Sequence, residues 1–292
     1  MADIKDFKCT YANSAGINEE VTRKLDLTFP EAYLHWDTMA AISLALKETD
    51  GAGFCELPFC HTVEAEAMGG IVNFGNEKIG PRAKEYICTK PEELLNLKEM
   101  DFSQGRLHEV LLACQHLRQK GENVVLEIAG PFTILNVLID IRHVFKAMRK
   151  QPELMKQVFR KIGDQLLKYI EEAQKYGVNM ISYADSSGAV SIIGPAMAEQ
   201  VVESFTYEFI KKAEALIGED AVLLLCPRTA LALIGTDKAE FTDTALPEPM
   251  RYGEACAWMI GKEKILGQMC IKNINCTLNN GICKAVRLKQ QK

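Results

Sequence analysis

Short apolar runs alternate with longer amphipathic segments along most of this chain. Two segments, 152–176 and 195–217, carry apolar residues at three- and four-residue spacings, begin near a proline and end just before a glycine, which predicts helices. The apolar runs show little polar alternation, as strands covered on both faces do. They span 53–58, 124–130, 180–188, 222–227, 239–243 and 265–271. We therefore expect repeated strand–helix units that build a mostly parallel sheet.

Two further segments predict antiparallel pairs outside this repeat. Residues 69–94 follow the first clear strand and have the pattern of a hairpin insertion. Residues 276–288 place Asn-Gly between two apolar runs, which is a strong short-range signal for a hairpin. No internal repeat or low-complexity linker divides the chain, so we expect residues 1–292 to form one domain.

Composition and charge narrow the class of partner. The chain is 48% hydrophobic and 25% charged, which is ample for a large core, and its net charge of −5 has the two signs interspersed. There is no basic footprint for nucleic acid or anionic lipid, so we expect small molecules or proteins as partners, with a homodimer as one assembly to test. The N-terminus has no apolar signal region and no uncharged stretch is long enough for a membrane span, which predicts a cytoplasmic protein.

Ten cysteines are many for such a protein. Without a secretion signal, reduced thiols are expected rather than a disulfide framework. Cys114 lies on the apolar face of a predicted helix and has the position of a small core residue. Cys226 and Cys270 instead follow apolar strands, where a functional role competes with that of a buried thiol.

Polar residues and thiols gather just past the predicted strands. In a parallel barrel the active site lies at these strand ends, and carboxylates, thiols and an imidazole are the groups that hold zinc. The residues at these positions are Glu56, Cys60, His61, Glu127, Gly130, Asp185, Ser186, Ser187, Cys226, Asp243 and Cys270.

Two strings carry a family resemblance: PFCHTVEAEAMGG at 58–70 and VLLLCPRT at 222–229. They resemble the methylcobamide:thiol methyltransferases of the uroporphyrinogen decarboxylase superfamily. The resemblance implies an α/β fold, a distorted (β/α)8 TIM-type barrel. Here the N-terminus would be shortened, with the first strands replaced or reduced near 7–12. From the residues alone, an open doubly wound sheet is the alternative.

The resemblance also implies a metal site. Cys226 matches the cysteine of the family's His-x-Cys pair, but Leu224 stands where the histidine would fall. Cys270 would supply the second thiolate, and Glu248 or His61 would complete the zinc shell. Asp185 would orient the substrate or handle protons, and His61 would act with it in catalysis.

Five residues would bind substrate by the same resemblance. They would line the pocket at the strand ends: Glu56, Cys60, Glu64, Gly130 and Phe132. For the glutamates of the segment 62–70, a solvated first helical turn, with acids favoured by the helix dipole, is the competing interpretation.

The function that follows is enzymatic methyl transfer. Relatives of this kind pass a methyl group between cobalamin, carried by a partner corrinoid protein, and a thiol or related acceptor in the one-carbon metabolism of anaerobes. Zinc would hold the acceptor as a thiolate at neutral pH. One alternative is a non-catalytic paralogue that binds a corrinoid protein or small ligand, suggested by Leu224 and the short N-terminus. Another is a cofactor-free decarboxylase-type lyase using Asp185.

Overall fold

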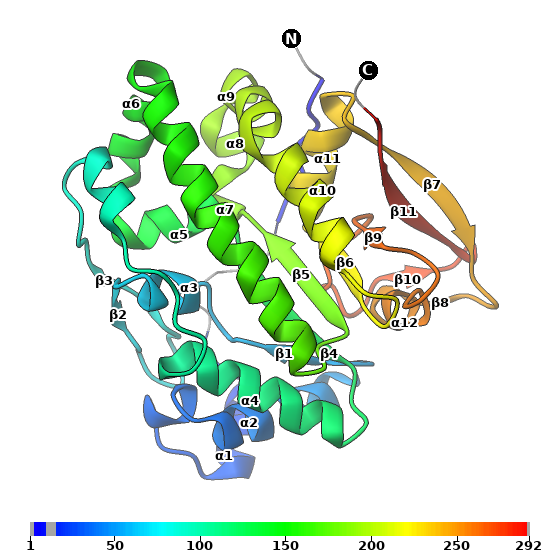
Figure 1. The fold of residues 1–292 in the computed structure, drawn as a ribbon. Helices are drawn as coiled ribbons and strands as arrows, with labels where there is room; N and C mark the ends of the chain where they lie inside the picture. The colour runs from blue at the N-terminus through cyan, green and yellow to red at the C-terminus, as the bar shows by residue number, and fades with distance from the viewer. Residues whose placement is uncertain (1–2, 10–15, 291–292) are drawn as a thin grey trace.

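A computed structural model of the chain describes residues 3–9 and 16–290. Its main sheet has seven strands in these residues, in the order β1-β4-β5-β6-β9-β11-β7 (Figure 1). The strands are β1 (Cys55–Leu57), β4 (Val124–Ala129), β5 (Met180–Ala184), β6 (Val222–Leu225), β9 (Ile265–Leu266), β11 (Ile282–Leu288) and β7 (Ala239–Ala245). The strands from β1 to β9 run parallel, and β11 is antiparallel to both of its neighbours. All six strands predicted from the apolar runs are therefore confirmed.

Long helices cover one face of this sheet. The predicted helix at 152–176 is α7 (Pro152–Lys175), and 195–217 divides into α9 (Pro195–Val201), a π-helical turn η4 (Val202–Thr206) and α10 (Tyr207–Leu216). The other helices are α1 (Glu19–Leu25), η1 (Glu31–Tyr33), α2 (Trp36–Asp50), α3 (Val63–Ala67), η2 (Pro91–Asn96), α4 (Gly105–Gln119), α5 (Pro131–Leu138), α6 (Ile141–Lys150), η3 (Ser186–Gly188), α8 (Val190–Ile193), α11 (Pro227–Gly235) and α12 (Tyr252–Trp258).

The two faces of the sheet belong to two different cores. Alternate strand residues such as Leu126, Ile181 and Leu223 pack with α4, α7 and α10 in the larger core. The residues between them, including Val125 and Leu224, pack with α12 in a second core. Because successive side chains of a strand point to opposite faces, this division follows directly from the strand register. We call the face covered by α12 the inner face.

The two predicted hairpins have different outcomes. Within 69–94, β2 (Ile71–Asn73) pairs antiparallel with β3 (Arg82–Glu85). The predicted hairpin at 276–288 is wrong. Gly281 does make a turn, with φ of 65°, but β10 (Thr277–Leu278) pairs with β8 (Met250–Arg251), while β11 pairs with β7 and β9. The two apolar runs separate because the second one extends the main sheet, where a seven-residue register with β7 is available.

The start of the chain passes over α11. The Arg228 guanidinium donates from Nε to the carbonyl of Phe7 over 3.1 Å. Residues 7–9 form no regular structure, and the rest of the segment 7–12, where reduced first strands were expected, lies outside the described residues. In the described part of the chain, no helix has the length and apolar character needed to cross a membrane.

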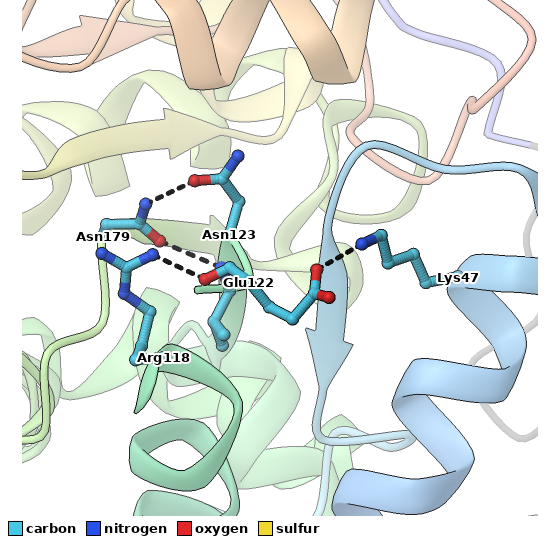
Figure 2. Close-up of polar contacts among 6 residues, drawn as sticks. Lys47, Arg118, Glu122, Asn123 and Asn179 are labelled. Atoms are coloured by element: carbon cyan, nitrogen blue, oxygen red, sulfur yellow. Dashed lines mark hydrogen bonds and ion pairs between the residues drawn. The ribbon is translucent and has the colours of Figure 1, made fainter. Parts of the chain in front are cut away.

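A polar network holds the amino ends of β4 and β5 (Figure 2). Asn179, which precedes β5, accepts from the backbone N–H of Val124 over 3.0 Å and donates to Asn123 Oδ1 over 2.9 Å. In the same network, Arg118 donates to the carbonyl of Glu122 over 2.5 Å, and the Glu122 side chain pairs with Lys47. These contacts join the amino ends of β4 and β5 to one another and to α2 and α4.

Replacing Asn179 should destabilise this end of the sheet. Its side chain is buried, so Asn179→Ala leaves the Val124 N–H without a partner, and we expect a loss of about 1–3 kcal/mol in the free energy of unfolding. Urea denaturation measures the change, with the exposed Asn136→Ala as the matched control. Equal stability of the two variants would show that the network does not stabilise the sheet.

Candidate functional site

A buried ion bridge crosses the inner face of the sheet. Lys272, in the loop after β9, places its Nζ 2.5 Å from Glu56 Oε1 and 2.9 Å from Glu127 Oε2. Glu56 lies in β1 and Glu127 in the neighbouring β4, whereas β9 is separated from them by β5 and β6. The loop after β9 therefore reaches back across the sheet to its opposite edge. We call Glu56, His61, Glu127 and Lys272 the lysine cluster.

The charges of the lysine cluster are set by burial and by each other. Burial raises the pKa of Glu56, and Lys272 opposes this shift. Burial lowers the pKa of Lys272, but Glu127 and Glu56 outweigh it, so the net shift is upward and the ammonium stays charged. Burial, followed by the charge of Lys272, lowers the pKa of His61 to about 4. At neutral pH, His61 is therefore a neutral imidazole that can accept a hydrogen bond.

Two thiols lie near this cluster. Cys226 follows β6, and Cys270 lies two residues before Lys272 in the loop after β9. Both side chains are partly buried, and burial raises the pKa of Cys226 and takes the pKa of Cys270 to about 12. Cys226 also raises the pKa of Cys270, so the two are close enough to interact electrostatically. Both are thiols rather than thiolates at neutral pH.

The full set of zinc ligands expected from the sequence does not come together. Leu224, at the position of the family's histidine, is buried in the inner-face core, and Glu248 is exposed between β7 and β8. The pKa of His61 is affected by the charges of Lys272 and Glu56, so this side chain belongs to the lysine cluster. Among the residues that the structure describes, no group of three or more His, Cys, Asp or Glu side chains could hold a metal ion. Because the expected donors do not assemble into such a group, the residues as arranged do not fit zinc.

The segment 62–70 turns its glutamates inward. Glu64 is 1% exposed, and its Oε1 accepts from the N–H of Ala129, at the end of β4, over 2.8 Å. Its Oε2 is buried without a hydrogen-bond partner in the described structure. Glu66 accepts from Arg106 Nε over 2.7 Å. The alternative of a solvated first turn is therefore wrong, because both acids have internal roles.

Arg106 holds Cys60 in the same region. Its Nη1 donates to Cys60 Sγ over 3.1 Å and its Nη2 to Thr62 Oγ1 over 2.7 Å. Cys60 is 4% exposed, so its thiol belongs to this buried cluster. Sequence reasoning missed Arg106, although an arginine beside Leu107 at the start of an amphipathic helix could have marked it.

Asp185 caps the helix that follows β4. Its carboxylate accepts from the N–H groups of Phe132 and Thr133, over 3.1 and 2.8 Å, and from Thr133 Oγ1 over 2.9 Å. Burial raises the pKa of Asp185 to about 6, against the effect of these donors. A Cβ at Gly130 would lie 2.3 Å from Asp185 Cβ, so only glycine fits there. These contacts account for the expected Gly130 turn and give Asp185 a structural task.

Phe132 lies in the hydrophobic core and not on the surface of a substrate pocket. Its ring is fully buried and packs on Phe159, with the ring centroids 5.3 Å apart. Asp185 does border a small cavity, together with Tyr183, Arg228 and Thr229. Several of the sequence-predicted residues thus divide between the lysine cluster, the buried contacts of Arg106 and the cap of α5, whereas Cys226, Cys270 and Glu248 lie outside these groups.

Comparisons with known proteins identify the family of the chain. The profile of the family described as Uroporphyrinogen decarboxylase (URO-D) matches residues 12–236. The methylcobamide:CoM methyltransferase MtaA of Methanosarcina barkeri (strain Fusaro / DSM 804) is 26% identical over 251 residues, 85% of this chain and 71% of that protein. The methylcobamide:CoM methyltransferase MtbA of Methanosarcina acetivorans is 23% identical over 219 residues, 72% of this chain and 62% of that protein.

A solved methyltransferase from Methanosarcina mazei is similar in structure. The TM-score is 0.62 at 22% sequence identity, over 74% of this chain and 65% of that one. This chain thus spans slightly less than two thirds of that protein. The likeness confirms the expected fold, a distorted barrel of the uroporphyrinogen decarboxylase kind, to which the described residues contribute seven strands in the main sheet. Glu248, Cys270 and Lys272 lie beyond the family match.

Glu64 should make the stability of the protein depend on pH. Burial raises its pKa from 4.5 to about 7. Between these values the folded protein keeps a proton that the unfolded chain has released, so stability should fall as the pH rises through this window. In the wild type we expect the free energy of unfolding to fall by about 3 kcal/mol as the pH rises through this window. The Glu64→Gln variant should not show this fall.

Denaturation between pH 4.5 and 8 tests this expectation. The exposed Glu171→Gln is the matched control and should keep the wild-type decline. If Glu64→Gln and the wild type lose stability in parallel across this range, Glu64 ionises in the folded protein as it does in water.

Proposed function

Because the chain belongs to the uroporphyrinogen decarboxylase family, we propose that it is a methyltransferase that moves a methyl group between a corrinoid protein and a small acceptor such as a thiol. The observation that carries the proposal is the relatives' activity. Both MtaA proteins of Methanosarcina barkeri, aligned over 85% and 81% of this chain, are named methylcobamide:CoM methyltransferases. The reaction would take place at the carboxyl ends of the parallel strands, where barrels of this type hold their active sites.

The position of the polar groups supports this assignment. Glu56, His61, Glu127 and Cys226 all lie within the family match and at or near strand ends. Lys272 adds a charge from the loop after β9. The inner face therefore combines a neutral imidazole, two carboxylates and one cation, a set that can orient a small polar acceptor and receive its proton.

The proposed methyl transfer needs no covalent bond to the protein. The acceptor sulfur forms a bond to the methyl carbon while the bond from that carbon to cobalt breaks, and the bonding electron pair remains on cobalt. The thiol proton must leave the sulfur in the same process. His61 would accept a hydrogen bond from this thiol, and Glu56, whose pKa is raised by burial, would take up the proton.

The zinc site expected from the sequence is not part of this proposal. When bound, zinc would lower the pKa of the acceptor thiol. The donors present do not fit it, because Leu224 is apolar and Glu248 is exposed away from the thiols. The proposed roles of His61, Glu56 and Glu127 do not depend on a metal.

The proposal can be tested by visible absorption spectroscopy with methylcobalamin. Its visible spectrum differs from that of its demethylated form, so methyl transfer to coenzyme M and other thiols can be followed under anaerobic conditions. We expect a spectral change that needs both protein and thiol. His61→Gln should slow it about a hundredfold, which is the low end of a general acid–base contribution.

The exposed His143→Gln is the matched control and should keep the wild-type rate. If no thiol gives a protein-dependent change even when a corrinoid protein carries the methyl group, the non-catalytic binding module becomes the better account of this chain. An equal rate for His61→Gln and His143→Gln would remove His61 from the mechanism.

A further inference from the structure

We propose that Lys272 is a positioning residue whose ammonium takes the place of a metal cation on the inner face, neutralising Glu56 and Glu127 and fixing the loop that carries Cys270. This inference goes beyond the proposed methyl transfer and does not require it. It accounts for a site that keeps its carboxylates and thiols but does not assemble a set of metal donors in the described residues.

The geometry of the bridge is that of a bound cation. Glu56 and Glu127 come from adjacent parallel strands, and one oxygen of each contacts the same Nζ, over 2.5 and 2.9 Å. Glu127 is 4% exposed, and its Oε2 has no hydrogen-bond partner of good geometry in the described structure apart from this ion pair. Two charged carboxylates that converge on one point are stabilised by a cation there, because burying such charges without a counter-charge is unfavourable.

Proteins commonly meet this need with a divalent ion. Magnesium and manganese are typically held by one or two carboxylates together with water molecules. Here the chain supplies the positive charge itself, from a residue 216 positions away from Glu56. An ammonium carries a single charge and cannot accept an electron pair, so the site has a permanent cation but not a Lewis acid.

The bridge also sets the position of Cys270. The loop after β9 has its own hydrogen bonds, from Asn273 N–H to the Cys270 carbonyl over 2.9 Å and from Cys276 N–H to the Asn273 carbonyl over 3.0 Å. These bonds shape the loop locally. The Lys272 bridge joins the loop to β1 and β4 by ion pairs, so removing the ammonium should loosen the part of the loop that carries Cys270.

Lys272→Ala tests whether the ammonium stands in a cation site. The substitution leaves two carboxylates facing the vacated position, so we expect the variant to bind about one Mn²⁺ per chain at least tenfold more tightly than the wild type does, measured by electron paramagnetic resonance. Mn²⁺ is the suitable probe because it prefers oxygen ligands to the thiols of Cys226 and Cys270. Methylammonium, which restores the missing group, should compete with Mn²⁺ in the variant.

The control is Lys284→Ala, which removes a more exposed lysine 3.9 Å from Asp243. It should bind Mn²⁺ no better than the wild type. If folded Lys272→Ala binds no more Mn²⁺ than Lys284→Ala, or if methylammonium has no effect on its binding, the proposal is overturned.

A second pair of variants covers the case in which Lys272→Ala does not fold. Lys272→Met keeps most of the side-chain volume and should lower the Tm by several degrees, because both carboxylates lose their counter-charge. Adding Glu56→Gln should recover part of that loss, since one of the uncompensated charges is removed. An unchanged Tm for Lys272→Met, or no recovery in the double variant, would contradict the role of the ammonium as a counter-charge.

Discussion

The ion bridge from Lys272 to Glu56 and Glu127 is the interaction on which the inner face depends. It joins the loop after β9 to β1 and β4, across the two strands that lie between them. In the described residues, β1 pairs with β4 alone and is not hydrogen-bonded to β7 at the other edge. The lysine therefore supplies a connection across the sheet in addition to the hydrogen bonds between neighbouring strands.

Much of the fold could be predicted because local pattern and tertiary structure agree. The runs at 124–130, 180–188 and 222–227 are apolar on both faces, and each became a buried parallel strand. The Asn-Gly turn before Ile282 was also a true local signal. The strand pairing on either side of this turn could not be predicted from local sequence. β11 pairs with β7 and β9, which precede the turn in the chain, and not with β10.

The candidate site was less predictable for a related reason. Glu56, His61 and Glu127 were found because they stand at or near strand ends, but Lys272 lies in an irregular loop with no periodic pattern. Glu64 shows the same limit: an acid in a first helical turn is solvated in most helices, and its contact with the N–H of Ala129 comes from a strand 65 residues away. The expected set of zinc ligands is incomplete because Leu224 stands at the position of a histidine donor, and its apolar side chain packs in the inner-face core.

Diffraction from crystals grown with equimolar zinc tests the central claim most directly. Data collected at the zinc absorption edge show where the ion binds, and the electron density shows where Lys272 lies. The structure predicts no zinc peak between Cys226 and Cys270, and a Lys272 ammonium in contact with both Glu56 and Glu127. A zinc ion bound by the two thiols, with Lys272 displaced from Glu127, would contradict the view that this chain carries its own cation.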